Sequence, residues 1–210
     1  MNRLILISRF VAIRIYTMIK LDFTKFKPEQ GKLLLSEPFS QDPNFKRTVV
    51  LLVTHDEEGS VGFVLNRPMD LKLEEIIDEF DSSHLPVWDG GPVQRDSLFY
   101  IHTLGDAIPD SIPITPELYW SGNFETVKAL IKENKLAENE IRLFIGYSGW
   151  GAQQLDNEIQ NNSWLVAPSS KDLVMNAGKD TDEKFWKNVI KSMGKDYSIL
   201  ANFPENPLWN

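Results

Sequence analysis

The chain of 210 residues contains no cysteine. The lack of thiols excludes disulfides, thiolate zinc sites, iron–sulfur clusters and a cysteine nucleophile, and it fits a cytoplasmic location. Other metal ligands are also poorly arranged, since the run His55-Asp56-Glu57-Glu58 falls in a predicted hairpin loop, where acidic side chains are usually solvated. No H-E-x-x-H pairing occurs. We therefore expect a cytoplasmic protein with no metal site and no cofactor.

Basic charge is scarce over most of the chain. Of the 22 Lys and Arg and 30 Asp and Glu, six and two lie in residues 1–30, which leaves 16 and 28 and a net charge of −12 for residues 31–210. A domain that binds duplex DNA normally carries a basic face, because neutralising phosphates supplies most of its affinity. We therefore predict no direct DNA binding.

Long apolar runs are absent as well, so we expect no membrane span. The opening "MNRLILISRFVAIRIYTMIK" is interrupted by Arg9 and Arg14, whereas a signal peptide needs an unbroken apolar stretch of roughly 7 to 15 residues. The same arginines spoil the amphipathic pattern of a membrane-surface helix. We interpret residues 1–30 as an N-terminal extension, with residues 1–17 disordered or artefactual and Met18 as the expected start.

From residue 31 onward the pattern predicts one domain over residues 31–210. Apolar and β-branched runs predict strands at 31–38, 47–55, 61–68, 98–104, 141–147 and 163–168, the second and third joined as a hairpin. Amphipathic spacing predicts a helix at 70–80, with Asp70 as its N-cap and Leu73, Ile76, Ile77 and Phe80 on one face. It also predicts helices at 123–135, capped by Asn123, from 151, and at 180–194, with Asp180 and Glu183 at capping-box spacing and Gly194 as its stop. This order predicts an α+β fold with a mixed, mostly antiparallel sheet and helices packed on it.

The stretch "IRLFIGYSGWGAQQLDNEI" reads as a strand, a glycine-spaced turn and a helix, which is the setting of a nucleophile elbow at Ser148. The elbow pattern G-x-S-x-G is broken, however, because Trp150 stands where its last glycine should be. All three histidines, His55, His84 and His102, precede the serine, whereas the triad of α/β-hydrolases runs serine, acid, histidine. This order excludes that triad. A convergent arrangement with His102 or His55 as the base stays open.

The glycines of this stretch also suggest a phosphate-binding turn, because free N–H groups at a helix start favour anions. Their spacing, G-x-x-G-x-G, reverses the dinucleotide fingerprint, and no G-x-x-x-x-G-K-[ST] motif is present. The simpler interpretation is that Gly146, Gly149 and Gly151 allow a sharp turn and close packing of a helix.

Several segments together resemble the AlgH/YqgE family of bacterial proteins, in order and over essentially all of residues 31–210. They are "GKLLLSEPF", "GFVLNRP", "WDGGPV", "LFYIHTL", "GYSGWGAQQL", "SWLVAP" and "ANFPENPLWN". The resemblance implies a single-domain cytosolic protein of mixed α+β fold, and it carries over no catalytic residues. Some members of that family are labelled as transcriptional regulators. Because the body of this chain is acidic, we expect any regulatory role to be indirect, through a protein or a ligand.

Two functional hypotheses follow. The first is a binding module for a protein or small-molecule partner, with a surface built from the loops "NRP", "GGPV" and "GYSGWG". Its candidate residues are Asn66, Arg67, Gly90, Gly91, Ser148, Trp150 and Gln154. We expect Arg67, Gly91 and Trp150 to line one concave patch. The alternative is a hydrolase that uses Ser148 or a carboxylate such as Glu158, and a histidine nitrogen within reach of the serine would favour it.

Overall fold

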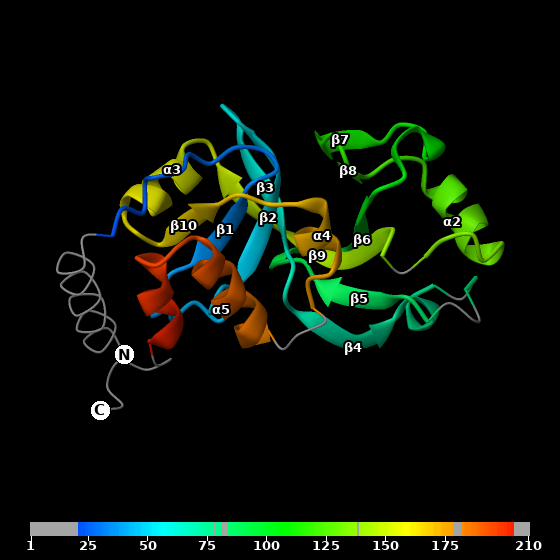
Figure 1. The fold of residues 1–210 in the computed structure, drawn as a ribbon. Coiled ribbons are helices and arrows are strands. Elements are labelled where there is room, and N and C mark those ends of the chain that lie inside the picture. Colours follow the sequence, from blue (N-terminus) through cyan, green and yellow to red (C-terminus); the bar gives the residue numbers. More distant parts are fainter. Residues whose placement is uncertain (1–20, 78, 81–83, 138, 179–181, 204–210) are drawn as a thin grey trace.

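The structure is a computed structural model that describes residues 21–77, 79–80, 84–137, 139–178 and 182–203. The chain folds as a single α+β domain in which short helices pack on a mixed sheet, as the sequence predicts (Figure 1). The strands are β1 (Leu33–Ser36), β2 (Val49–Asp56), β3 (Gly59–Val64), β4 (Pro68–Lys72), β5 (Pro86–Asp89), β6 (Val93–His102), β7 (Ile112–Thr115), β8 (Leu118–Trp120), β9 (Ile141–Gly151) and β10 (Trp164–Ala167). The helices are α2 (Phe124–Lys132), α3 (Gln154–Gln160), α4 (Lys171–Met175) and α5 (Asp182–Ser192), with 3-10 turns η1 (Leu73–Glu75), η2 (Gly105–Ala107) and η3 (Tyr197–Asn202).

The ten-stranded sheet runs in the order β10-β1-β2-β3-β9-β6-β8-β7, and β5 joins it against β9 and carries β4. The β5–β9 pair is parallel, with Val87 opposite Leu143. The other strand pairs of the described residues are antiparallel. The prediction of a mixed, mostly antiparallel sheet is therefore confirmed.

Strand β9 connects the two parts of the sheet. Its first half pairs with β5 and β6, and its second half pairs with β3, where Ser148 lies opposite Gly62 and Trp150 opposite Ser60. Gly146, at φ +69°, lets this long strand change direction without ending. The predicted turn at "GYSGWG" is therefore wrong, because residues 147–151 stay paired as a strand.

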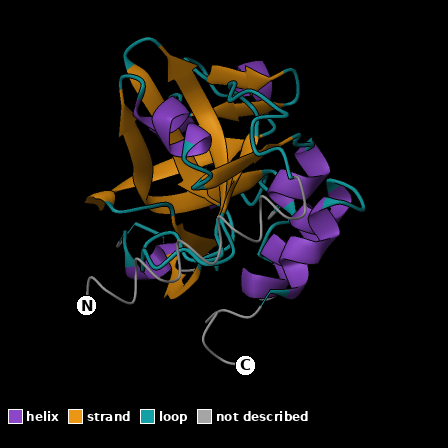
Figure 2. Cartoon of the chain, turned by 90° about the vertical axis from the view of Figure 1, so that its left-hand side faces the viewer, coloured by secondary structure: helices purple, strands orange, loops and turns teal. Residues whose placement is uncertain are grey.

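Both faces of the β10-β1-β2-β3 part are buried, which explains its unbroken apolar runs. In β2, Leu51 belongs to a cluster that includes Trp186 of α5, and Leu52 belongs to a cluster that includes Leu155 of α3. Helices α3 and α5 consequently lie on opposite sides of these strands (Figure 1), and Figure 2 shows the helices arranged around the sheet. A third cluster joins β5, β6 and the first half of β9 to α2.

The predictions that rest on turn residues and helix ends are confirmed for the β2–β3 hairpin, for the start of α2 and for the end of α5. Strands β2 and β3 form the predicted hairpin, with Asp56 opposite Gly59. Asn123 caps α2 by accepting a hydrogen bond from the Thr126 N–H over 2.9 Å. After α5, Gly194 adopts φ +120°, as expected for a helix stop, whereas the predicted cap Asp180 lies outside the described residues.

The predicted helix over residues 70–80 is wrong. The chain instead continues as β4 and the short turn η1, because β4 pairs with β5 and the Leu73 N–H donates to the Leu85 carbonyl over 3.1 Å. Asp70, expected as a helix cap, is an exposed strand residue. Leu73 and Phe80 are buried as their spacing suggested, so the apolar pattern located the core contacts and not the secondary structure.

The chain before β1 packs against the core from residue 21. Phe23 is buried, and the Tyr197 hydroxyl donates to the Asp22 carbonyl over 2.8 Å. Residues 1–17, predicted to be disordered or artefactual, lie outside the described residues. Within the described part of the chain, no helix is long and apolar enough to cross a membrane.

Candidate functional site

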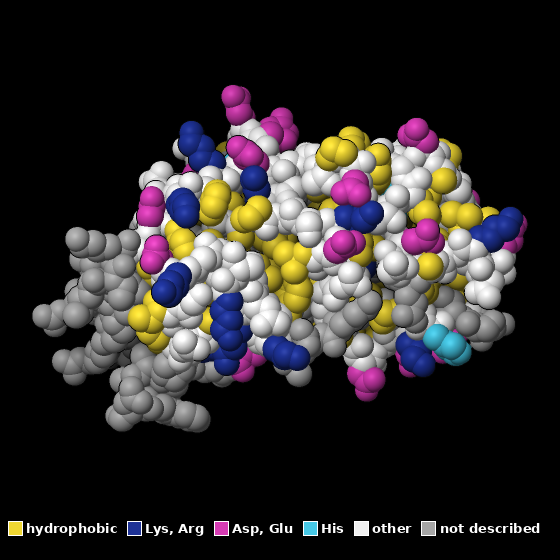
Figure 3. Space-filling view, in the orientation of Figure 1, with side chains coloured by type: hydrophobic (Ala, Val, Ile, Leu, Met, Phe, Trp, Pro, Cys, Tyr) yellow, Lys and Arg dark blue, Asp and Glu magenta, His cyan; other side chains and the backbone are white. Residues whose placement is uncertain are grey.

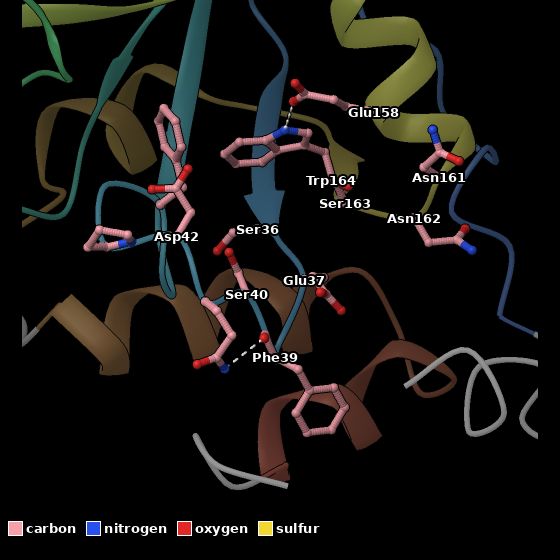
Figure 4. Close-up of a pocket in the computed structure, with 13 residues that line it drawn as sticks. Ser36, Glu37, Phe39, Ser40, Asp42, Glu158, Asn161, Asn162, Ser163 and Trp164 are labelled. Atoms are coloured by element: carbon pink, nitrogen blue, oxygen red, sulfur yellow. Dashed lines mark hydrogen bonds between the residues drawn. The ribbon is translucent and has the colours of Figure 1, made fainter. Parts of the chain in front are cut away.

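A pocket of about 650 Å³ opens between the loop that follows β1 and the end of α3 (Figure 4). The residues that line it are Ser36, Glu37, Phe39, Ser40, Gln41, Asp42, Pro43, Phe45, Glu158, Asn161, Asn162, Ser163 and Trp164. They come from two separate segments: the end of β1 with the loop that follows it, and the last turn of α3 with the connection to the start of β10. A concave site of this volume, lined by aromatic and polar side chains, has the ordinary features of a ligand pocket.

Glu158 is held at the wall of this pocket by three neutral donors. Its Oε2 accepts hydrogen bonds from the indole nitrogens of Trp150 and Trp164, over 3.0 and 2.8 Å. Its Oε1 accepts from the Gln154 amide over 2.9 Å, and Gln154 in turn accepts from the Gly151 N–H over 3.0 Å. The carboxylate is thus fixed in place, and none of these three donors carries a positive charge.

Aromatic rings back the same wall. The rings of Trp150 and Trp164 meet edge to face, with centroids 5.7 Å apart. Phe45 packs on both, at 6.1 Å from Trp150 and 5.3 Å from Trp164. Both tryptophans are buried, at 6% and 3% exposed. This packing gives the pocket a rigid apolar side.

The charge of the pocket lining is of one sign. The carboxylates among the described lining residues are those of Glu37, Asp42 and Glu158, and none of these 13 described residues is Lys, Arg or His. Asp42 is exposed, and its Oδ1 accepts from the Asn44 N–H over 2.8 Å, which shapes the loop. The pocket therefore presents negative charge beside aromatic surface.

Asn66 and Arg67, two of the predicted binding residues, support the β1–β2 loop. The buried Asn66 accepts from the Val49 N–H over 2.8 Å and donates to the Arg47 carbonyl over 2.9 Å. The guanidinium of Arg67 donates to the carbonyl of Pro43, a lining residue, over 2.9 Å. Arg67 thus holds a lining residue directly, whereas Asn66 holds the end of the same loop, beyond the lining residues.

Gly90, Gly91 and Ser148 form a buried junction where the chain crosses β9. The Gly90 N–H donates to the Ile145 carbonyl over 2.9 Å, and the Ser148 hydroxyl donates to the Gly90 carbonyl over 3.1 Å. A Cβ on Gly91, at φ +145°, would lie 2.4 Å from the Tyr147 carbonyl oxygen. These glycines are required because backbone lies directly against backbone.

The structure does bring the three predicted loops together. The Asp89 N–H donates to the Arg67 carbonyl over 2.9 Å, which joins "NRP" to "GGPV", and Gly91 packs on Tyr147 of "GYSGWG". Most of the candidate residues are nevertheless buried, namely Asn66, Gly90, Gly91, Ser148 and Trp150. Arg67 is partly exposed and Gln154 is exposed.

The surroundings of Ser148 differ from those of a serine nucleophile. Its side chain is 0% exposed. His55 pairs with the Ser60 hydroxyl over 2.8 Å, and the exposed His84 lies 3.2 Å from Glu74. The Nδ1 of His102 accepts from the Leu104 N–H over 3.3 Å, so its neutral Nε2–H donates to the Ser121 carbonyl over 3.1 Å. Each histidine thus has partners other than this serine.

Burial lowers the pKa of His102 below its usual 6.5, although the hydrogen bond to Ser121 opposes the shift. Its ring is therefore a neutral, satisfied part of the core. Among the described residues, no group of three or more His, Asp or Glu side chains could hold a metal ion.

Sequence reasoning missed most of the pocket lining. The predicted strands at 31–38 and 47–55 leave only a short loop over residues 39–46, whereas twelve residues separate β1 from β2 in the structure. The loop "EPFSQDPNFKRT" combines acidic, aromatic and proline residues. Its contact with the end of α3 depends on the fold, so the spacing of residues could not reveal it.

Comparison of the sequence with a family model and with known proteins gives matches over most of the chain. The sequence model of a family described as AlgH-like matches residues 33–198. The chain is 40% identical to a UPF0301 protein of Bacteroides thetaiotaomicron, over 92% of this chain and 97% of that protein. It is 42% identical to a UPF0301 protein of Chlorobaculum tepidum, over 90% of this chain and 98% of that one.

Two solved structures share the fold. The solution structure of the AlgH protein from Pseudomonas aeruginosa superposes with a TM-score of 0.66 at 27% identity, over 85% of this chain and 98% of that one. A crystal structure from Corynebacterium diphtheriae superposes with a TM-score of 0.70 at 22% identity, over 88% of this chain and 96% of that one.

Proposed function

The chain belongs to the AlgH-like family, and we propose that it is a binding module whose ligand occupies the pocket beside Glu158. The observation that carries this proposal is the fixed carboxylate at the pocket wall, held by two indoles and an amide. Binding sites combine an apolar wall with a few polar groups of defined orientation, and this pocket offers both.

The segments that resemble the family contribute in two ways: residues of "GKLLLSEPF" and "SWLVAP" line the pocket, and residues of other segments support it from outside the lining. Trp150 and Gln154 of "GYSGWGAQQL" orient Glu158, and Arg67 of "GFVLNRP" holds the carbonyl of Pro43. These three are positioning residues, since they fix groups that face the ligand. The glycines of "GGPV" and the buried Ser148 maintain the β9 junction.

A hydrolytic role for Ser148 gains no support from this geometry. The hydroxyl is buried and donates to a backbone carbonyl, and nucleophilic attack would require both access and a neighbouring base. The carboxylate of Glu158 accepts three hydrogen bonds, so most of its acceptor capacity is used in holding it in place. Binding of a ligand in the pocket requires neither an accessible serine nor a neighbouring base.

We further propose that the protein works in the cytoplasm and that any regulatory effect is indirect. The zero cysteine count supports the location, and the net charge of −12 over residues 31–210 opposes contact with DNA. On the face shown in Figure 3, Lys and Arg side chains are interspersed with Asp and Glu, which is unlike the basic face of a DNA-binding domain.

The proposal is tested by filling the pocket. Ser40 lines it, so Ser40→Trp should block it, whereas Ser192→Trp places the same ring at the exposed end of α5 as a matched control. Each protein is immobilised and incubated with a bacterial lysate, and the retained metabolites and proteins are identified by mass spectrometry. Species retained by the wild type and by Ser192→Trp, and lost from a folded Ser40→Trp, are the expected result. Equal retention by all three would refute the site.

A further inference from the structure

Resting on the proposed function, we infer that the ligand of this pocket presents an alkylammonium group, in the form of a linear polyamine or a lysine side chain. The inference goes beyond the existence of a site, because it fixes the charge and the chemical class of the occupant. Four properties of the pocket support it.

The first property is the charge of Glu158, which forms no ion pair with the described residues. Its three donors, Trp150, Trp164 and Gln154, are neutral, so they orient the carboxylate without cancelling its charge. The lone pairs of Oε2 are used by the two indoles, whereas Oε1 accepts from the single Gln154 amide and keeps capacity for one further donor. An ammonium supplies both that donor and the missing positive charge.

The second property is the opposite wall. Asp42 lies on the β1–β2 loop, exposed and within the lining, so a cation entering the pocket meets carboxylates from both segments (Figure 4). Among the described lining residues there is no Lys, Arg or His, so none of them offers a positive charge to these two carboxylates. An anionic ligand would instead be repelled from both walls.

The third property is the aromatic surface. Phe39, Phe45 and Trp164 line the pocket, and ring faces attract cations through their quadrupole. The methylene groups of a polyamine or a lysine side chain also match such a surface, because they are apolar while the head group is charged. Acidic and aromatic groups together therefore favour an alkylammonium over an inorganic cation.

The fourth property is the position of the pocket at the C-terminal end of α3. Asn161 and Asn162 directly follow this helix and line the pocket. The carbonyls of Asn157, Glu158 and Ile159 already accept hydrogen bonds from the N–H groups of residues 161–163, so the acceptors that this end offers to a ligand are side-chain oxygens. Those of Asn161 and Asn162 provide acceptors for N–H donors.

The test uses two probes with the same head group. The first is spermidine, a linear triamine, and the second is a short peptide with a single central lysine and blocked termini. Binding to the full chain is measured by calorimetry, and the Trp164 indole signal is followed in ¹H–¹⁵N spectra. Binding of spermidine alone assigns the site to free amines, and tighter binding of the peptide assigns it to a protein partner.

Charge-neutral variants separate the site from the general attraction of an acidic protein. Asp42→Asn keeps the oxygen that shapes the loop, and Glu158→Gln keeps one oxygen for the indoles, so both are expected to fold. Glu57→Gln, in the exposed β2–β3 turn, removes the same charge outside the lining. We expect binding to weaken by about fivefold or more in each pocket variant and by less than about twofold in the control.

Equal weakening in all three variants would overturn the inference, because it would reduce the effect to net charge. Failure of both probes to bind would overturn it as well. If the lysate still yields a species that only Ser40→Trp loses, the binding site stands and its alkylammonium ligand class is wrong. If no such species is retained, the proposed function is refuted together with the alkylammonium ligand class.

Discussion

Trp150 and Trp164 donate from their indole nitrogens to one oxygen of Glu158, over 3.0 and 2.8 Å. One residue lies at the end of β9 and the other at the start of β10, and Glu158 belongs to the helix between them. A single carboxylate of α3 therefore connects the end of β9 with the start of β10, and with them the segments "GYSGWGAQQL" and "SWLVAP". The same contact presents that carboxylate to the pocket formed with the β1–β2 loop.

Glu158→Ala should be strongly destabilising, because it leaves the buried indole N–H groups of Trp150 and Trp164 without their acceptor. We expect a loss of about 3 kcal/mol in the free energy of unfolding, measured by urea denaturation. Glu57→Ala, in the exposed β2–β3 turn, should change it by less than about 0.5 kcal/mol. Similar values for both variants would mean that the indole contacts contribute nothing.

Gly91, which packs against β9, and Gly151, the last residue of β9, should respond differently to substitution by alanine. At Gly91 a Cβ would lie 2.4 Å from the Tyr147 carbonyl oxygen, with φ at +145°, whereas at Gly151 the nearest atom is 3.9 Å away. We therefore expect Gly91→Ala to lower the free energy of unfolding by about 3 kcal/mol or more, and Gly151→Ala to leave it within about 0.5 kcal/mol. A tolerated Gly91→Ala would show that the close approach is not required.

Arg142 should be essential to the packing of β9 against α4, β5 and Leu65, the residue that follows β3. Its guanidinium is buried in β9, donates to the carbonyls of Val174 and Leu65 over 2.6 and 2.8 Å, and stacks on Trp88 at 4.2 Å. Arg142→Met keeps much of the apolar stem but leaves both carbonyls without this donor. We expect a loss of about 3 kcal/mol in urea denaturation. A stability equal to that of the wild type would show that burying the charge costs as much as its contacts contribute.

His102 should make stability depend on pH. Burial lowers its folded-state pKa below the 6.5 of the unfolded chain, so its contribution is present above pH 6.5 and is lost as pH falls from 6.5 through the folded-state pKa. His102→Gln removes the titrating group. The difference in unfolding free energy between wild type and variant should therefore shrink as pH falls from 7 to about 5. If the difference in unfolding free energy does not change over this pH range, the pKa of His102 is not lowered in the folded protein.

How much the sequence predicted depended on the range of the contacts involved. The β2–β3 hairpin and the Asn123 cap rest on neighbouring residues, and both were predicted. The prediction of a helix over 70–80 was wrong because β4 pairs with β5, and this pairing forms only when the chain folds back on itself. The turn at "GYSGWG" failed because Gly146 bends a strand whose second half finds a new partner in β3.

The site followed the same rule. Its candidate residues were chosen from motifs, and the structure shows Asn66, Arg67, Trp150 and Gln154 supporting a pocket that other residues line. Motif residues are distinctive because buried turns and buried polar groups tolerate few substitutes. The lining of the pocket comes from a loop and a helix end that lie more than a hundred residues apart in the chain, so no local pattern joins them.

The most direct test of the central claim is to locate binding on the assigned protein by ¹H–¹⁵N spectroscopy, before and after addition of the species retained from lysate. The account predicts that the perturbed signals cluster at residues 37–45 and 161–164 and at the Trp164 indole, and that Ser40→Trp abolishes these changes. Perturbations confined to another part of the surface, with the amides of residues 37–45 and 161–164 unchanged, would contradict it.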